Sequence, residues 1–220
     1  MIVNYPRMKR RVKGWPDDLD TALEFSSANP FSISAPKNWD GKLEYTNGSG
    51  WKMWDGSAIA SGEIENNHYI YLRGTGNSKI TGVKSSNAKW NIIGTNIACN
   101  GDIDLLLDYS TVKSGNRPTL ADRCYAYMFW DCMSLTAAPS LPATTLALYC
   151  YYYMFQGCTK IKLSTTASGT YTKPYRIPKS GTGTTTAGAL NGMFANTGGT
   201  FKGTPKINTT YYLDKSNTIV

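Results

Sequence analysis

The sequence predicts an α+β protein in which a β-rich N-terminal domain, a small sandwich or β-layer, precedes a short repeat solenoid. Two observations predict this fold class. Short alternating runs separated by Gly and Asn fill residues 36–117, as in strands joined by tight turns. From residue 118 a phrase recurs, as "CYAYMFWDC" at 124–132 and "CYYYMFQGC" at 150–158. Recurrence at fixed spacing is typical of proteins that stack small repeated units.

The composition favours a loop-rich β protein of an extracellular or virion surface over a cytosolic enzyme. The chain has 220 residues, of which 41% are hydrophobic and only 17% charged. It carries no apolar run near the roughly 18 residues that cross a bilayer, so membrane insertion is not expected. No apolar stretch follows the basic residues near the start, so we expect no secretory signal and synthesis in a cytoplasm.

Residues 1–35 are expected to form an N-terminal docking arm. Pro6, Pro16 and Pro30 interrupt this segment, and only "DDLDTALEF" at 17–25 could form a short helix or strand. The arm offers little apolar area, so it needs a partner surface. Its basic cluster either docks on an acidic patch or is a solvated face that keeps the protein soluble. The cluster consists of Arg7, Lys9, Arg10, Arg11 and Lys13.

A second basic stretch lies near the C-terminus and has the same two interpretations. No acidic residue stands between Asp131 and Asp214. Seven basic residues fall there: Lys160, Lys162, Lys173, Arg176, Lys179, Lys202 and Lys206. Such one-signed stretches favour polyanionic surfaces through an attraction that salt screens. A direct nucleic-acid role is not expected.

The β-rich domain is predicted over 36–117. "KLEYTNGSGWKMWDG" places two alternating runs around Asn47-Gly48, and both of these residues tolerate the positive φ that tight hairpins need. "HYIYLRGTGNSKITG" and "KWNIIGTNIACNGDIDLLLDY" are expected to add further strands, separated by Gly and Asn turns.

The solenoid is predicted over 118–220, with two intact repeats and one degenerate repeat. Residues 119–144 align with 145–170 at a period of 26, and the degenerate repeat follows at 189–210. An insertion at about 168–186, rich in Pro, Gly and Thr, is expected to loop out. Leu120, Cys124, Met128 and Cys132 recur every four residues, which predicts a helix of about three turns. Thr119 would cap this helix with Asp122 as its partner, and Gly157 would end the second helix.

The segment "LADRCYAYMFWDCMSLTAAPSLPATTLALYCYYYMFQGCTKI" resembles the leucine-rich repeats called BspA-like. These occur in surface proteins of gut bacteria and in virion proteins of gut phages. The resemblance covers residues 40–165 well and 187–213 loosely. It implies a binding or display module with no catalytic residues. Because no signal or anchor is visible, we expect a phage structural protein, a decoration, fibre or adhesin subunit in the virion; the alternative is a bacterial surface-associated adhesin.

The four repeated cysteines are interpreted as reduced core thiols. On a helix, Cys124 and Cys132 would lie roughly 12 Å apart, beyond disulfide reach. A disulfide between repeats and a metal site are the alternatives, although zinc spacing is absent and His68 is the only histidine. Asp102, Asp104 and Asp108 lack a calcium-loop pattern. No acid pair or cofactor motif stands out, so we expect no enzyme and no cofactor.

Aromatic residues are the candidate binding residues. Three consecutive tyrosines on a helix would point around it, so they cannot all face the core. The candidates are Tyr125, Tyr127, Trp130, Tyr151, Tyr152 and Tyr153. They would contact a host surface protein or glycan, or else pack against the neighbouring domain or the insertion. The other expected partners are capsid or tail proteins, with further copies of this chain in a homo-oligomer as an alternative.

Overall fold

The computed structural model describes residues 12–37, 39, 41–81 and 87–217. This part of the chain is mostly β, with a single α-helix, α1 (Leu105–Lys113). The short helices η1 (Leu19–Thr21) and η3 (Lys215–Asn217) are 3-10 helices. The strands are β1 (Leu23–Ser27), β2 (Ser32–Ser34), β3 (Leu43–Thr46), β4 (Lys52–Trp54), β5 (Ile59–Ala60), β6 (Gly62–Ile64), β7 (Asn67–Gly74), β8 (Asn91–Ile93), β9 (Ile97–Asn100), β10 (Leu135–Ala137), β11 (Thr145–Leu146), β12 (Lys162–Ser164), β13 (Tyr171–Arg176), β14 (Thr184–Thr185), β15 (Gly198–Gly199) and β16 (Thr210–Asp214).

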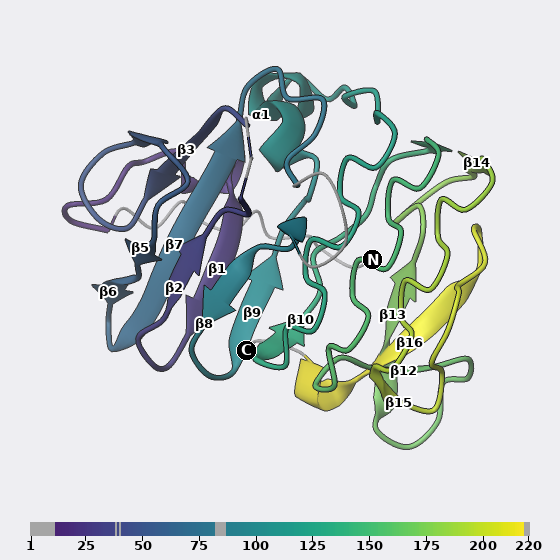
Figure 1. Ribbon diagram of the computed structural model, residues 1–220. Helices are drawn as coiled ribbons and strands as arrows, with labels where there is room; N and C mark the ends of the chain where they lie inside the picture. The colour runs from purple at the N-terminus through teal and green to yellow at the C-terminus, as the bar shows by residue number, and fades with distance from the viewer. Residues whose placement is uncertain (1–11, 38, 40, 82–86, 218–220) are drawn as a thin grey trace, which may run out of the picture.

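A seven-stranded sheet organises the N-terminal half (Figure 1). Its order is β10-β9-β1-β7-β3-β4, and β6 also pairs with β7. β1 lies between β7 and β9, and its Leu23 and Phe25 are fully buried. The predicted arm is therefore wrong for the residues from Leu23 onward. The prolines around "LEFSS" suggested irregular chain, but alternate apolar residues place this strand at the centre of the sheet.

The residues just before β1 are also anchored to the fold. The buried Arg73 on β7 donates to Asp18 at 2.6 Å and to Glu44 at 2.9 Å. Its guanidinium lies 3.9 Å from the ring centre of Trp51 and 4.3 Å from that of Tyr109. Charge pairing and cation–π contact thus fix residues around Asp18 against β3, β7 and α1. Of the basic cluster, Lys13 is exposed, whereas Arg7, Lys9, Arg10 and Arg11 lie outside the described residues.

Two predictions for the β-rich region had different outcomes. The hairpin is confirmed, because β3 and β4 pair in antiparallel register with Leu43 opposite Trp54. The strands expected in "KWNIIGTNIACNGDIDLLLDY" are confirmed as β8 and β9, but the end of this segment, from Leu105, forms α1 instead of a strand. Leu105, Leu106 and Leu107 are all buried, so no alternation distinguishes the faces of a strand there.

The repeats are not helical. Each copy forms a run of tight turns, which we call turn unit 1 (residues 121–132), turn unit 2 (147–158) and turn unit 3 (186–197). Every fourth residue has a left-handed backbone. These residues, with φ in degrees, are Arg123 (60), Tyr127 (62) and Asp131 (53); Tyr149 (55), Tyr153 (51) and Gly157 (74); Gly188 (72), Gly192 (61) and Asn196 (56). The left-handed positions show that the predicted helices and their caps are wrong. A helix was predicted because the four-residue period of the turns is close to the 3.6-residue period of a helix. Asp122 instead accepts a hydrogen bond from the Leu148 amide at 3.2 Å.

Backbone hydrogen bonds join the turn units into a stack. Alternate residues bond within their own unit, as Cys124 N–H does to Ala121 at 3.3 Å. The residues between them bond to the next unit: Tyr125 N–H donates to Cys150 at 3.0 Å, and Tyr151 N–H to Ala189 at 2.9 Å. This alternation satisfies the backbone without a helix.

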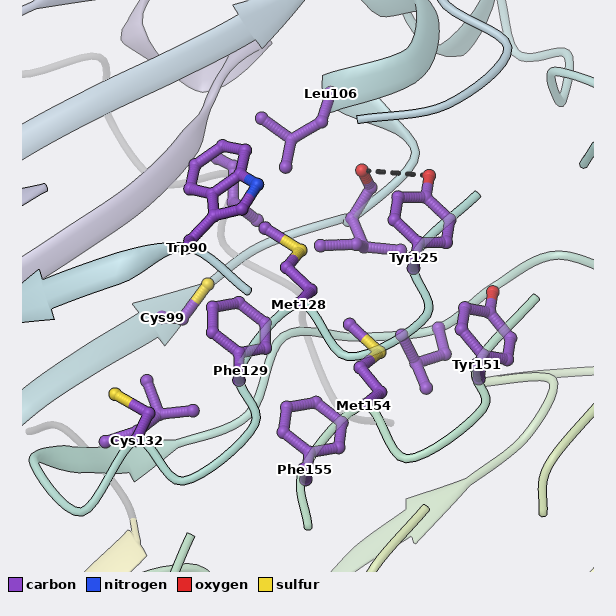
Figure 2. Close-up of a cluster of buried hydrophobic side chains, with 14 of the residues drawn as sticks. Trp90, Cys99, Leu106, Tyr125, Met128, Phe129, Cys132, Tyr151, Met154 and Phe155 are labelled. Carbon is purple, nitrogen blue, oxygen red and sulfur yellow. Dashed lines mark hydrogen bonds between the residues drawn. The ribbon is translucent and has the colours of Figure 1, made fainter. Parts of the chain in front are cut away.

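Equivalent side chains stack along the same direction (Figure 2). The rings of Phe129 and Phe155 lie 5.4 Å apart and nearly parallel. The rings of Phe155 and Phe194 lie 5.5 Å apart. Tyr125 and Tyr151 stack at 5.6 Å. The repeated phrase is therefore a set of core positions that meet between units.

The core is continuous between the sheet and the stack. The ring centre of Phe25 on β1 lies 6.3 Å from that of Phe129 in turn unit 1. The backbone N–H of Trp90 donates to the Met128 carbonyl at 3.0 Å. β10, which follows turn unit 1, pairs in parallel with β9. The predicted boundary between residues 117 and 118 thus crosses one hydrophobic core rather than separating two.

The insertion at 168–186 is partly ordered as strand rather than looped out. β13 pairs with β16 in the four-stranded sheet β13-β16-β12-β15. β14, near the end of the insertion, pairs in parallel with β11. The remaining sheet, β5-β2-β8, contributes Ile33 and Ile59 to the shared core.

Candidate binding surface on the turn stack

Two of the six predicted binding residues belong to the core. Tyr125 and Tyr151 are fully buried, which corrects their assignment as ligand contacts. Turn geometry rather than helical geometry places both rings between units (Figure 2). The Tyr125 hydroxyl donates to Asp104 at 3.1 Å, whereas the buried Tyr151 hydroxyl has no hydrogen-bond partner in the described part of the chain.

The other four candidates lie together on the surface, with one further tyrosine. We call this half-buried group the aromatic surface: Tyr127, Trp130, Tyr149, Tyr152 and Tyr153. The ring of Tyr127 lies 5.7 Å from Trp130, 5.4 Å from Tyr152 and 5.7 Å from Tyr153. Tyr152 in turn lies 5.2 Å from Tyr149 and 4.3 Å from Tyr153. Every member is thus within ring contact of another.

The left-handed positions explain why these rings gather. Tyr127, Tyr149 and Tyr153 all occupy left-handed positions of the turns. Their rings extend along the stack: Tyr149 lies over Gly188, and Tyr153 over Gly192, where any Cβ atom would collide with the ring. Glycine in turn unit 3 therefore leaves the space that the tyrosines of turn unit 2 occupy, and this packing restricts the ring positions.

Two cations border the aromatic surface. Lys89 Nζ lies 5.6 Å from the ring centre of Trp130, and the Arg123 guanidinium lies 4.5 Å from that of Tyr149. Burial, followed by the neighbouring Tyr153 and Tyr127, raises the pKa of Tyr152 to about 12. Its hydroxyl, like that of an ordinary tyrosine, is protonated at neutral pH. Flat apolar rings, protonated phenols and flanking cations can contact the C–H faces and the hydroxyl groups of sugars.

Sequence reasoning missed Tyr149, Lys89 and Arg123. Tyr149 stands 26 residues after Arg123, so the two residues are equivalent in the repeat alignment. The predicted helix had its apolar face at other positions, so this position was not singled out. Once the left-handed period is known, the alignment places Arg123 and Tyr149 in the same column as Gly188. Lys89 comes from the β-rich region, and no local pattern connects it to the repeats.

The cysteine interpretation is confirmed, although its helical premise was wrong. All five cysteines are free and buried. Burial raises the pKa of the Cys150 thiol to about 12, and the Cys158 thiol donates to the Phe129 carbonyl at 3.0 Å. Within the described residues, no three His, Cys, Asp or Glu side chains are placed to hold a metal ion.

Two shallow hollows lie elsewhere on the surface. One of about 330 Å³ borders turn unit 3, and one of about 350 Å³ lies between Asn96, Lys160 and Lys162. Neither is lined by an acidic residue, so neither provides the carboxylate pair of a glycoside hydrolase.

Comparisons with known proteins assign no role to the aromatic surface. No family model, no curated protein and no solved structure matches the chain. Over the described ranges, no helix is both long enough and apolar enough to span a membrane.

Proposed function

We propose that the chain is a non-enzymatic structural protein of a phage virion, a decoration, fibre or adhesin subunit, that displays the aromatic surface to host glycans. The observation that carries this proposal is the grouping of five half-buried aromatic rings between Lys89 and Arg123. Aromatic residues are favoured contact residues because they bury a large area at low entropic cost.

The finer fold proposal is a BspA-like leucine-rich-repeat solenoid with two intact repeats and one degenerate repeat. The ladder of hydrogen bonds and the stacked Phe129, Phe155 and Phe194 support it, because each unit buries its apolar side against a neighbour. A short strand also follows each turn unit, namely β10, β12 and β15. β12 and β15 pair in parallel, as successive repeats of a solenoid do.

Binding by the aromatic surface can be tested on intact host cells. We expect Tyr152→Ala or Tyr153→Ala to weaken binding of the purified protein to host cells by about tenfold, a usual effect for a central aromatic contact. Tyr171→Ala, a half-buried tyrosine on β13, is the matched control and should bind normally. Prior removal of surface glycans should abolish binding. Unchanged binding after glycan removal would point to a host protein instead, and unchanged binding by both variants would refute the proposed surface.

Docking is proposed for the basic cluster that ends at Lys13. Deleting residues 1–14 should leave the anchored Asp18 and Arg73 in place, so the fold should survive. We expect the truncated protein to be absent from purified virions, because the basic cluster would pair with an acidic patch on a capsid or tail protein. A control that exchanges Arg7, Arg10 and Arg11 for Lys keeps the charge and should incorporate. Full occupancy without residues 1–14 would refute the docking role.

A bacterial surface-associated adhesin is the second candidate function. The same aromatic surface serves it, and the sequence resemblance extends to surface proteins of gut bacteria. Mass spectrometry of purified virions and of bacterial surface fractions separates the two. Recovery from virions supports the first proposal, and recovery only from the bacterial surface supports the second.

A further inference from the structure

The two ends of the turn stack differ in how their backbone groups are satisfied. At turn unit 1, the β-rich region covers the end: Ile80 N–H donates to Cys124 at 3.2 Å, and Trp90 N–H to Met128. At turn unit 3, residues 203–204 cover only part of the end. Phe194 N–H donates to Gly203 at 3.0 Å, and Gly192 N–H to the Thr204 hydroxyl at 2.9 Å.

Leu190 marks the uncovered part of this end. It occupies the position of Tyr125 and Tyr151, whose N–H groups donate to the next unit. Beyond turn unit 3 no further unit follows, and in the described part of the chain nothing accepts a hydrogen bond from Leu190 N–H. Leu190 instead lines the hollow of about 330 Å³, which we call the end groove. A buried donor without a protein acceptor is costly unless a solvent or ligand oxygen satisfies it.

A second backbone segment near the end groove also has an unpaired edge. β14 is an edge strand, since among the described strands it pairs only with β11. Thr184 N–H donates toward β11, to Thr144 at 2.8 Å. Because successive residues of a strand point their backbone groups to opposite sides, those of Thr185 point away from β11. Thr185 and Leu190 both line the end groove, so an occupant alongside β14 would pass both residues.

We propose that the end groove binds an extended, acidic peptide segment of another protein chain, which adds alongside β14 and accepts the hydrogen bond of Leu190 N–H. Main-chain addition to a strand edge is a general mode of peptide recognition. The chain itself covers the neighbouring half of this end with one main-chain acceptor, the Gly203 carbonyl, and one side-chain acceptor, the Thr204 hydroxyl.

The charge of the groove selects the occupant. Lys206 lines it, and no acidic residue occurs between Asp131 and Asp214. An acidic segment therefore meets a favourable field, and a basic segment an unfavourable one. A second copy of this chain would bring its own Lys206 to the same place, which disfavours end-to-end stacking of two copies.

The test uses the full-length, ¹⁵N-labelled protein and three synthetic peptides: alternating Glu-Thr, Gln-Thr and Lys-Thr. We expect Glu-Thr to shift the amide resonances of Leu190 and Thr185 and to bind roughly threefold tighter than Gln-Thr, an advantage that high salt removes. Lys206→Glu should reverse the preference toward Lys-Thr. Lys173→Glu, an exposed lysine of β13 away from the groove, should leave it unchanged.

Three results would overturn the proposal. The first is the absence of any shift at Leu190 with all three peptides. The second is equal binding of the three peptides, or a preference that Lys206→Glu does not alter. The third is a shift at Leu190 that depends on protein concentration alone, which would assign the end groove to a second copy of this chain. None of these readouts involves the aromatic surface, so they are independent of host binding.

Discussion

At the scale of single residues, Asp104 is a carboxylic acid buried in the core. Its side chain is fully buried beside the Tyr125 hydroxyl, with Arg117 at 3.7 Å. Burial, and then the nearby charge of Asp102, raises its pKa from 3.8 to about 7. Arg117 is itself paired with Asp102, so it only partly compensates for the desolvation of Asp104.

The raised pKa predicts a loss of stability on the alkaline side. Below about pH 4 Asp104 is protonated in both states; from there to about pH 7 the folded state binds the extra proton, so the free energy of unfolding falls as pH rises. Asp104→Asn should remove up to roughly 4 kcal/mol of this dependence, from about 1.4 kcal/mol per unit of pKa difference. Urea unfolding at about pH 4 and about pH 8 measures it. If the variant keeps the slope of the parent protein, Asp104 is not its source.

The stacked Tyr125 and Tyr151 give a matched pair for a second prediction. Tyr125→Phe removes the donor to Asp104 and should destabilise the protein by about 1–3 kcal/mol. Tyr151→Phe removes a hydroxyl that is buried without a partner, so it should be neutral or stabilising by about 1 kcal/mol. Thermal unfolding of both variants checks the difference. Equal destabilisation would mean that the Tyr151 hydroxyl is satisfied, for instance by a buried water.

At the scale of elements, the four-residue period of apolar residues in the repeats does not distinguish a helix from a run of turns. Apolar residues at every fourth position indicate a helix only if the backbone is right-handed throughout. Here Tyr127, Tyr149 and Tyr153 adopt left-handed geometry, although tyrosine has no preference for it. The sequence feature that indicates turns lies in the degenerate repeat, where Gly188, Gly192 and Asn196 stand four residues apart. Alignment of all three copies would have indicated turns.

Gly192 tests the turn geometry directly. Gly192→Ala places a methyl group against the ring of Tyr153, at a backbone position with a φ of 61° that costs alanine about 1–2 kcal/mol. We expect a clear loss of stability, together with weaker host-cell binding because the Tyr153 ring is displaced. Gly48→Ala, in the β3–β4 hairpin with open space around it, is the control. Denaturant midpoints that agree for the two variants would contradict the packing of Tyr153 on Gly192.

At the scale of the whole molecule, local patterns in the sequence were sufficient for some features and not for others. The β3–β4 hairpin depends on neighbouring residues, and its turn signal was visible. The place of β1 depends on β7 and β9, which lie about 40 and 70 residues further along the chain, so no local pattern determines it. The aromatic surface was partly predictable from the repeated tyrosines, but which rings are buried follows from the stacking of units.

The shared core predicts that sheet and stack unfold together. Phe25 of β1 contacts Phe129, and Trp90 of the β-rich region contacts Met128 of turn unit 1, so opening the stack exposes apolar surface of the sheet. Tryptophan fluorescence of Trp130→Phe reports on the sheet side of the core. Four of the remaining tryptophans lie in the β-rich region, and the fifth, Trp15, packs against Tyr71 of β7. Labelling of the buried Cys150 and Cys158 thiols, in a variant with the other three cysteines replaced by Ala, reports on the stack.

Measured in a chain carrying all four changes, the two probes should give the same free energy of unfolding and the same midpoint. Thiol labelling well before the fluorescence change would mean that the stack opens alone, and the chain would then consist of two folding units.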